Sequence, residues 1–474
     1  MTVQLALSAA LSGLRTTQQQ AALLSHNLAN ATTAGYVRRD LNLSAVVTAG
    51  QGGGVRVDSI GRKVDELLIR DARYETSRYT AQEARASALA DYALVLGQPQ
   101  DQKSVSTQLS KLQQAFSRLH DMPNDDAAQN AVVSQATALA AGLNSAADAA
   151  QAVIGDARDR LQTSVDTVNA ALHRVGDLNG SIAALEARGG DAGDLRDERD
   201  RLLDQVSQEI GIRTYTGDDG QVVVMTRNGQ TLMDRSLEPG DTPLALVGGE
   251  LQINGQRLAW LGDGAPPSGT APNPDTEIQT GRIMGYVQTI TRDMPRALDQ
   301  LDQLAEGLVQ GFQAAEADPA GAGLFVLAAG TDGAAARIAV NPAVQGESWR
   351  VRSGIQAAAP LEPGDQTQID KFLGAFTATH AFSATDLTMP NATLGAYATA
   401  MVSAQQGYRT GAETEMNARK IGADTLETAR VNRDGVNIDD EMQKLLLIEQ
   451  SYGASAQVIQ VAGRMIDILL QIKG

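Results

Sequence analysis

One stretch of the sequence, residues 25–39, reads SHNLANATTAGYVRR and decides how the segments around it are interpreted. We expect a preceding helix to end at Asn30, because Thr33, Ala34 and Gly35 follow it as a turn. Glycine adopts positive φ at little cost, so Gly35 suits the sharpest point of that turn. Tyr36 then anchors the start of the next segment. The stretch therefore predicts a helix end, a reversal and a new element in immediate succession.

Apolar residues before this stretch recur at alternating steps of four and three. This spacing places them on one stripe of a helix, as in the seam of a coiled coil. An ordinary amphipathic helix packed on its own domain gives the same pattern, so this segment leaves both interpretations open. The positions are Val3, Leu7, Ala10, Leu14, Thr17, Ala21, Leu24 and Leu28.

The C-terminal segment repeats the pattern. Asn437 can cap a helix, and the acidic residues 439–441 occupy its first turn, where the helix dipole favours negative charge. Two terminal helices of this kind could pair in antiparallel fashion, or each could dock onto its own domain. The C-terminal stripe consists of Ile448, Tyr452, Ser455, Ile459, Ala462, Ile466 and Leu469.

The chain between the two ends is predicted to be mostly helical. Helix-forming composition and glycine or proline breaks predict helices over about 63–96, 104–120, 126–187, 281–317 and 392–474, the last broken at Asp434-Gly435. Turn residues 217–220, 248–249 and 254–255 punctuate strand-like runs, so 211–262 is predicted to be a small β region. A loop is expected over 264–274, and a mixed segment over 319–385.

Composition excludes several classes of function. The net charge of −17 leaves no excess of lysine and arginine for a phosphate-binding face, which argues against nucleic acid. The chain has no cysteine, so thiolate metal sites and disulfides are excluded. Aromatic residues make up only 4%, so most of the core must come from aliphatic side chains. No window approaches the ~20 apolar residues of a membrane helix, and no signal peptide is visible at the N-terminus.

No chemical site emerges from the motifs. The four histidines, His26, His120, His173 and His380, are widely separated, and no nucleophile stands beside a base. The run of alternating charges over 196–201 is interpreted as a solvated, self-paired helix face. We therefore predict no catalytic residues, no cofactor and no metal, and expect that the protein is not an enzyme.

The stretch 25–39 resembles the signature of the bacterial flagellar rod, hook and hook-associated proteins, which reads roughly N-N-I-A-N-x-x-T-x-G-Y-x-R. His26 replaces the first Asn and Leu28 replaces Ile. Residues 434–442, DGVNIDDEM, look like the family's S-G-V-N-L-D-E-E, and residues 449–456, EQSYGASA, look like its Q-Q-x-Y-x-A-S-A. The motif residues are Asn27, Ala29, Asn30, Thr33, Gly35, Tyr36, Gly435, Val436 and Asn437.

Residues 194–203, DLRDERDRLL, are similar to a pattern of the hook-associated members at the hook–filament junction, and the long helical tract fits them too. The resemblance implies a structural axial subunit of the flagellum that forms this junction and is required for filament assembly. It implies export through the flagellar type III channel without a cleaved signal peptide, and an extracellular location on the flagellum.

The implied fold is mainly α with β insertions. We expect a terminal coiled-coil domain (1–35 and 436–474) and a helical bundle domain (36–210, 281–318 and 388–435). A small β-rich outer domain (211–280) and a mixed β or irregular segment (319–387) complete the layout.

The family implies self-association in the flagellar axis, contacts with the hook protein and the second junction protein, and an export chaperone on the C-terminal helix. It implies neither nucleic acid binding nor membrane insertion. For self-assembly, we hypothesise that Val3, Leu7, Leu14, Ala21, Leu24 and Leu28 pack against Ile448, Tyr452, Ile459, Ile466 and Leu469.

Two other functions remain as alternatives. Another axial protein, such as a hook or rod subunit, would share both terminal motifs but have little helix between Lys63 and Ala187. A secreted adhesin or enzyme would use the middle domains, and would need a deep pocket with converging His, Asp or Glu side chains within 211–385.

Overall fold

The structure, a computed structural model, describes residues 3–48, 51–217, 219–234, 236–262, 274–316 and 321–472. It divides into two compact units. The first comprises residues 1–77, 167–244 and 420–474, and the second comprises 78–166 and 245–419. Three long helices, α2 (Glu66–Leu96), α4 (Asp126–Glu186) and α12 (Leu394–Asp434), contribute residues to both units.

The predicted fold class, mainly α with β insertions, is confirmed. The helix boundaries follow local signals in the sequence: α3 (Val105–Asp121) begins after Ser104, whose side chain accepts from the Thr107 amide at 3.3 Å. The observed α4 agrees with the predicted 126–187 to within one residue. The break at Asp434-Gly435 separates α12 from α13 (Ile438–Ile472) as expected.

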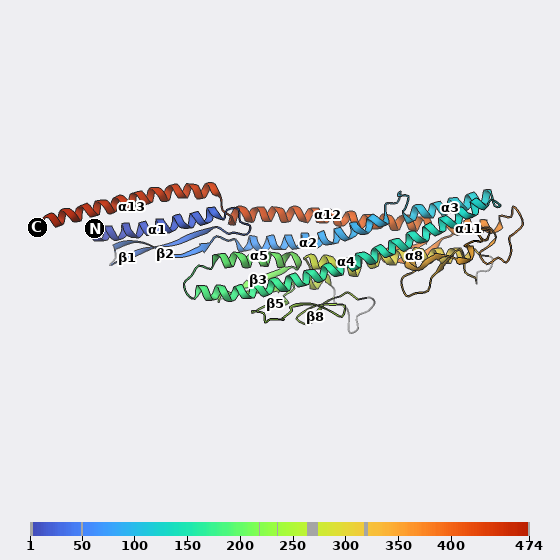
Figure 1. Ribbon diagram of the computed structural model, residues 1–474, viewed down its shortest axis with the longest axis horizontal. Helices are drawn as coiled ribbons and strands as arrows, with labels where there is room; N and C mark the ends of the chain where they lie inside the picture. Colours follow the sequence, from blue (N-terminus) through green and yellow to red (C-terminus); the bar gives the residue numbers. More distant parts are fainter. Residues whose placement is uncertain are drawn as a thin grey trace. The chain divides into compact units, whose positions relative to one another are not determined.

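The first unit contains both chain ends. α1 (Val3–Ala29) and α13 lie side by side and run in opposite directions, so the two termini lie at the same end of the pair (Figure 1). Gly13 marks a close approach, because a Cβ there would lie 3.4 Å from the Ser455 hydroxyl. A two-stranded antiparallel sheet, β1 (Arg39–Thr48) and β2 (Gln51–Arg62), packs against α1. Both terminal helices therefore pair with each other as well as docking onto their own unit.

This β1–β2 hairpin was not predicted, since 36–210 was assigned to a helical bundle. Its signal was present as alternation of apolar and other residues, with Leu41, Leu43 and Ala45 on β1 opposite Ile60, Val57 and Val55 on β2. Glycines at 52–54 and 61 weakened the pattern. Whether the remaining domain boundaries hold as functional divisions stays a prediction.

The first unit also contains α5 (Gly193–Glu209) and a three-stranded sheet of β3 (Ile212–Thr216), β4 (Val222–Thr226) and β5 (Thr231–Met233). Leu178, Ile182 and Ala192 form a buried cluster against which Leu195 and Leu202 pack. The amide of Asn179 fixes α4 to the sheet, because it donates to the Val222 carbonyl at 3.0 Å and accepts from the Val222 amide at 3.2 Å.

The second unit concentrates the few aromatic rings of the chain. Phe116 of α3, Phe312 of α8 (Met294–Ala314) and Phe372 of α11 (Thr367–Thr377) have ring centroids 5.6–5.9 Å apart. Phe325 and Phe376 join the same cluster, so five of the six phenylalanines meet here. The remaining one, Phe382, stacks on Tyr397 at 3.9 Å.

Smaller elements complete this unit. They are β6 (Leu244–Val247), at the boundary between the units, β7 (Glu250–Ile253), β8 (Gln256–Trp260), α6 (Pro274–Glu277), α7 (Arg282–Gln288), the π-helical turn Thr289–Asp293, β9 (Phe325–Leu327), α9 (Ala334–Arg337), β10 (Ile338–Val340), the 3-10 turn Pro342–Val344, α10 (Arg350–Ser353), β11 (His380–Ala384) and β12 (Leu387–Ala392).

The middle segments differ from expectation in two respects. The predicted β region holds two separate three-stranded sheets, β3-β4-β5 and β6-β7-β8. The predicted mixed segment contains the regular helix α11, whose spacing of Ile369, Phe372 and Phe376 is helical and was missed. The expected turn residue Asp218 and most of the expected loop, residues 263–273, lie outside the described residues.

The aromatic cluster yields a stability prediction. Phe312→Ala is expected to lower the free energy of unfolding of the second unit by about 3–5 kcal/mol, because a fully buried ring is replaced by a cavity. Denaturant titration followed by hydrogen exchange would measure it. Leu94→Ala is the control: Leu94 is 83% exposed, so its loss should cost less than about 0.5 kcal/mol. Equal effects of the two variants would contradict the assignment of this core.

Candidate assembly site at the terminal helices

Asn27, near the end of α1, uses its whole hydrogen-bonding capacity. Its amide nitrogen donates to the Arg39 carbonyl at 2.9 Å and to Glu441 Oε2 at 3.0 Å. Its amide oxygen accepts from the Tyr36 hydroxyl at 2.7 Å and from the Arg39 amide at 3.2 Å. The side chain is 1% exposed. One residue therefore joins the end of α1, the start of β1 and the first turn of α13.

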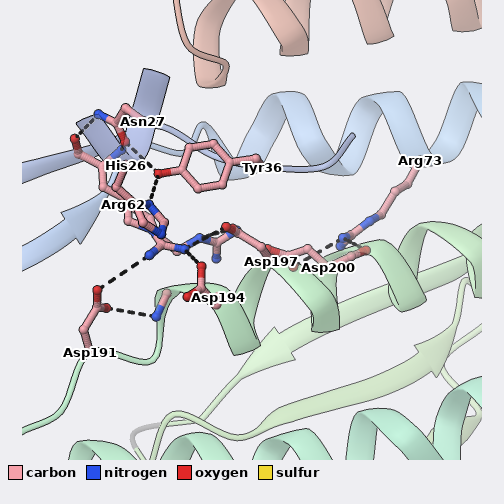
Figure 2. A network of polar contacts seen from close by, with 11 residues as sticks. His26, Asn27, Tyr36, Arg62, Arg73, Asp191, Asp194, Asp197 and Asp200 are labelled. Atoms are coloured by element: carbon pink, nitrogen blue, oxygen red, sulfur yellow. Dashed lines mark hydrogen bonds and ion pairs between the residues drawn. The ribbon is translucent and has the colours of Figure 1, made fainter. Parts of the chain in front are cut away.

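The turn after α1 presents Tyr36 to this network. Gly35 takes φ +76°, as predicted, and a Cβ there would lie 2.5 Å from Arg201 Cγ. The Tyr36 hydroxyl also lies 3.0 Å from His26 Nδ1 (Figure 2). Burial raises the pKa of Tyr36 to about 12, so the hydroxyl remains a proton donor to Asn27.

The start of α13 is fixed by polar contacts of its own. Asn437 accepts from the Asp439 amide at 3.0 Å, so it caps the helix as predicted. Glu441, 3% exposed, accepts from Asn27 and from Lys444 Nζ at 2.6 Å. The Asp434 carboxylate accepts from the Asp65 amide at 3.1 Å. The connection between α12 and α13 is therefore attached to the start of α2.

A ladder of ion pairs runs along one face of α5 (Figure 2). Arg62 lies 2.8 Å from Asp197 and 2.6 Å from Asp200. Asp197 pairs with two arginines of the hairpin, Asp200 with one from the hairpin and one from α2, and Asp204 with one from α2 and one from α12. The carboxylates are Asp194, Asp197, Asp200 and Asp204, and the arginines are Arg39, Arg62, Arg73 and Arg430.

This ladder corrects the interpretation of 196–201 as a solvated, self-paired face. The side chains of Arg39 and Asp197 are 4% and 8% exposed. Arg199 is also buried, and donates to Asn179 Oδ1 at 2.9 Å. The aspartates recur at steps of three, three and four, which places them on one face of the helix. This spacing could have indicated that the aspartates share one face. Their arginine partners could not be identified from it, because they are distant in sequence.

The pKa values of the two central carboxylates, Asp197 and Asp200, shift in opposite directions. At Asp197 burial dominates and raises the pKa, although Arg62 and Arg39 oppose it. At Asp200 burial also acts to raise the pKa, but the charges of Arg62 and Arg73 outweigh it, and the pKa lies below its ordinary value.

The structure separates the hypothesised assembly residues into buried, partly buried and exposed sets. Leu24 is buried, whereas Leu28, Tyr452 and Ile466 are 38%, 43% and 37% exposed. The side chain of Leu469 lies outside the described residues. The partly buried members are Val3, Leu7, Leu14, Ala21, Ile448 and Ile459.

The remaining motif residues lie at the same junction. Ala29 is the last residue of α1, and Asn30 donates to the His26 carbonyl at 3.0 Å. Thr33 donates to Asn30 Oδ1 at 3.3 Å. Gly435 lies where a Cβ would be 2.4 Å from the Val431 carbonyl oxygen, and Val436 follows it, between α12 and α13.

Much of α13 is apolar and exposed. Eleven large apolar side chains on this helix are 37–64% exposed, among them Met442, Leu446 and Val461. Large apolar side chains that remain exposed in such numbers on one helix indicate an interaction site. Within the described ranges, no group of three or more His, Cys, Asp or Glu side chains could hold a metal ion. None of the described helices is long and apolar enough to cross a membrane.

Comparisons with known proteins agree with the helical middle of the chain and with its C-terminal motif. Residues 95–323 match the family described as the flagellar hook-associated protein FlgK helical domain, and residues 428–472 match the flagellar basal body rod FlgEFG protein C-terminal family. The chain is 23% identical to flagellar hook-associated protein 1 of Bacillus subtilis, over 96% of each chain.

Two further similarities cover less of the chain. Flagellar hook-associated protein 1 of Escherichia coli is 24% identical over 64% of this chain, and the match spans 55% of that relative's length. The structure of the flagellar hook junction protein FlgK from Burkholderia pseudomallei shares 21% identity with a TM-score of 0.46, over 55% of this chain and 47% of that one.

The Asn27 network predicts a large effect of an isosteric change. Asn27→Asp removes both donors and places a carboxylate beside buried Glu441, so we expect a loss of about 3 kcal/mol or more in the free energy of unfolding of the first unit. Chemical denaturation at neutral pH would measure it. Asn417→Asp, on an exposed position of α12, is the control and should be nearly neutral. A neutral Asn27→Asp would contradict the role given to this side chain.

The ladder predicts a pH-dependent effect of Asp200→Asn. Because the folded-state pKa of Asp200 is lowered, its carboxylate stabilises the fold above the ordinary carboxyl pKa and loses this contribution as the pH falls through the folded-state value. The variant should be about 1–3 kcal/mol less stable at pH 7, with the difference shrinking below about pH 4.

Unfolding curves of Asp200→Asn across this range, beside the exposed-pair control Asp156→Asn, test the sign. Asp156 and its partner Arg160 are 57% and 54% exposed, so the control should change stability by less than about 0.5 kcal/mol. A difference that grows as the pH falls would contradict the assignment.

Proposed function

We propose that this chain, which belongs to the FlgK family of flagellar hook-associated proteins and is a structural subunit of the hook–filament junction, assembles through α1, the β1–β2 hairpin and α13. The family is structural, and its members are located on the flagellum. Subunits of this kind associate along the flagellar axis and contact hook-related partners. The finer proposal concerns which surfaces make these contacts.

The observation that carries the proposal is the exposed apolar surface of α13. Its side toward α1 is partly buried, with Ile448, Ser455 and Ala462 less exposed than their neighbours. The other faces still show large side chains to solvent, Leu446 at 58% and Met442 at 45%. Burial of such side chains contributes roughly 25 cal/mol per Å², which would drive subunit addition.

The polar network around Asn27 also supports the proposal. Hydrogen bonds to Asn27 and Glu441 fix the relative position of α1 and α13 before any neighbour arrives. A preorganised surface loses less conformational entropy on association than two mobile helices would. The hypothesised contacts of Leu28, Tyr452 and Ile466 therefore belong in part to neighbouring copies.

The remaining partners extend the family assignment. The subunit would be exported without a cleaved signal peptide and act outside the cell, between the hook protein and the second junction protein. A chaperone would cover the apolar faces of α13 before export, because they would otherwise promote premature association. The subunit would join two assemblies of different geometry, and we propose no catalytic step.

A deletion of the gene in the source bacterium should leave hooks without filaments and release filament subunits into the medium. Restoration of filaments by the wild-type chain, counted by electron microscopy, supports the proposed function. Normal filaments in the deletion strain would contradict it.

Variants of α13 test the surface. Met442→Glu with Leu446→Glu should fold, because both side chains are exposed, but should fail to restore filaments in the deletion strain. Leu94→Glu, at an 83% exposed position of the second unit, is the matched control and should restore them. Circular dichroism of the purified variants checks folding. Full restoration by the α13 variant would contradict assembly through this face.

A further inference from the structure

Asp434, the last residue of α12, lies where three segments of the first unit meet. Its backbone carbonyl accepts from the Arg38 amide, just before β1, at 2.9 Å. Its side-chain Oδ1 accepts from the Asp65 amide, directly before α2, at 3.1 Å. The connection to α13 begins at the next residue, Gly435. One residue therefore attaches the junction between α12 and α13 to the chain before β1 and to the chain before α2.

The second carboxylate oxygen of Asp434 is buried without a partner. Oδ2 accepts no hydrogen bond within the part of the chain that the structure describes. The whole residue is only 4% exposed. A carboxylate oxygen that loses its hydration without a replacement disfavours the ionised form of the group. The closed junction therefore accommodates a neutral Asp434 better than an ionised one.

The two nearest cations are committed to other carboxylates. Arg430, one turn earlier on α12, places Nη2 at 2.8 Å from Asp204 Oδ2. Arg433 is 67% exposed, and its Nε lies 3.9 Å from Asp65 Oδ2. No ion pair joins Asp434 to either arginine among the described residues, and Asp65 brings a second negative charge close to it.

The pKa of Asp434 follows from these surroundings. Burial raises it, and the charge of Asp65 adds to this effect. The Asp65 amide and the charges of Arg430 and Arg433 act against burial, but the pKa still lies above its ordinary value. The stabilisation that the neutral carboxyl provides is therefore complete below the ordinary carboxyl pKa and is lost as the pH rises through the folded-state value.

A cavity of about 250 Å³ lies beside the junction, between the turn after α1 and the end of α12. Besides Asp434, its titratable lining groups are Tyr36, Glu427 and Arg430. Burial raises the pKa of Tyr36 to about 12, so its hydroxyl carries no charge near neutral pH. The cavity has room for several water molecules. A small displacement of the connection therefore suffices to hydrate the Asp434 carboxylate.

We propose that Asp434 is a pH-sensitive switch of the α12–α13 junction: its neutral form keeps the connection closed on the chain before α2, and its ionised form favours opening. Opening lets α13 change direction at Gly435 without unfolding either helix. The inference goes beyond the proposed function and does not depend on it, because it concerns a single chain.

Hydrogen exchange of the full chain, resolved to single amides, tests the switch. The reporter is the Asp65 amide, because an amide in a hydrogen bond exchanges when that bond opens. Its protection factor is the intrinsic exchange rate divided by the measured rate at the same pH. Between about pH 4.5 and about pH 8 this factor should fall by at least about threefold, since each unit of pKa shift corresponds to about a tenfold change in the equilibrium.

Two neutral replacements assign this pH dependence to Asp434. Asp434→Asn keeps an oxygen that can accept from the Asp65 amide, and Asp434→Ser introduces the residue of the family motif at this position. In both variants the fall should shrink to less than about 1.5-fold, because the titrating group is gone. Asp424→Asn, at an exposed position of α12, is the matched control and should keep the wild-type dependence. Circular dichroism checks folding, and Asp434→Ser decides if Asp434→Asn does not fold.

A wild-type protection factor that stays constant or increases with pH would overturn the inference. An unchanged fall in the folded Asp434 variants would also overturn it, because Asp65 or Glu427 would then be responsible. The same holds if Asp424→Asn removes the fall, since the effect would then be one of general charge. Filament counts do not enter this experiment, so its failure leaves the proposed function standing, and the reverse is also true.

Discussion

The first unit depends on the complete hydrogen bonding of one buried amide, that of Asn27. A buried polar group is stable only when its donors and acceptors are satisfied, and this one is satisfied by the turn after α1, by the start of β1 and by α13. The contacts to Arg39, Tyr36 and Glu441 place the start of the hairpin and the start of α13 around the end of α1. Two chain ends separated by some four hundred residues thereby form one folded surface.

The ion-pair ladder extends this constraint to the rest of the first unit. Arg39 belongs both to the Asn27 network, through its backbone, and to the ladder, through its guanidinium. The carboxylates of α5 then connect the hairpin to α2 and α12 by way of Arg62, Arg73 and Arg430. Such buried charge pairs hold these elements together, because removing one partner leaves an uncompensated charge and is costly.

The sequence predicted those features that depend on neighbouring residues. α3 begins directly after Ser104, and α4 begins directly after the polar turn that precedes Asp126. The turn at Gly35 follows from the conformational freedom of glycine. The hairpin β1–β2 was missed because glycines interrupt its alternation. The partners of Asn27 and Asp197 were out of reach, since Glu441 and Arg62 come close only through the tertiary fold.

The terminal helices therefore carry two kinds of surface. The polar contacts between their ends are complete within one chain, whereas their apolar faces remain exposed in one chain. Hydrogen exchange on the isolated chain and on assembled flagella tests this division most directly. We predict that the Arg39 amide is equally protected in both states, while the amides of residues 441–468 are protected in the isolated chain and gain further protection on assembly. Equal protection of α13 in both states, or an Arg39 amide protected only in flagella, would contradict it.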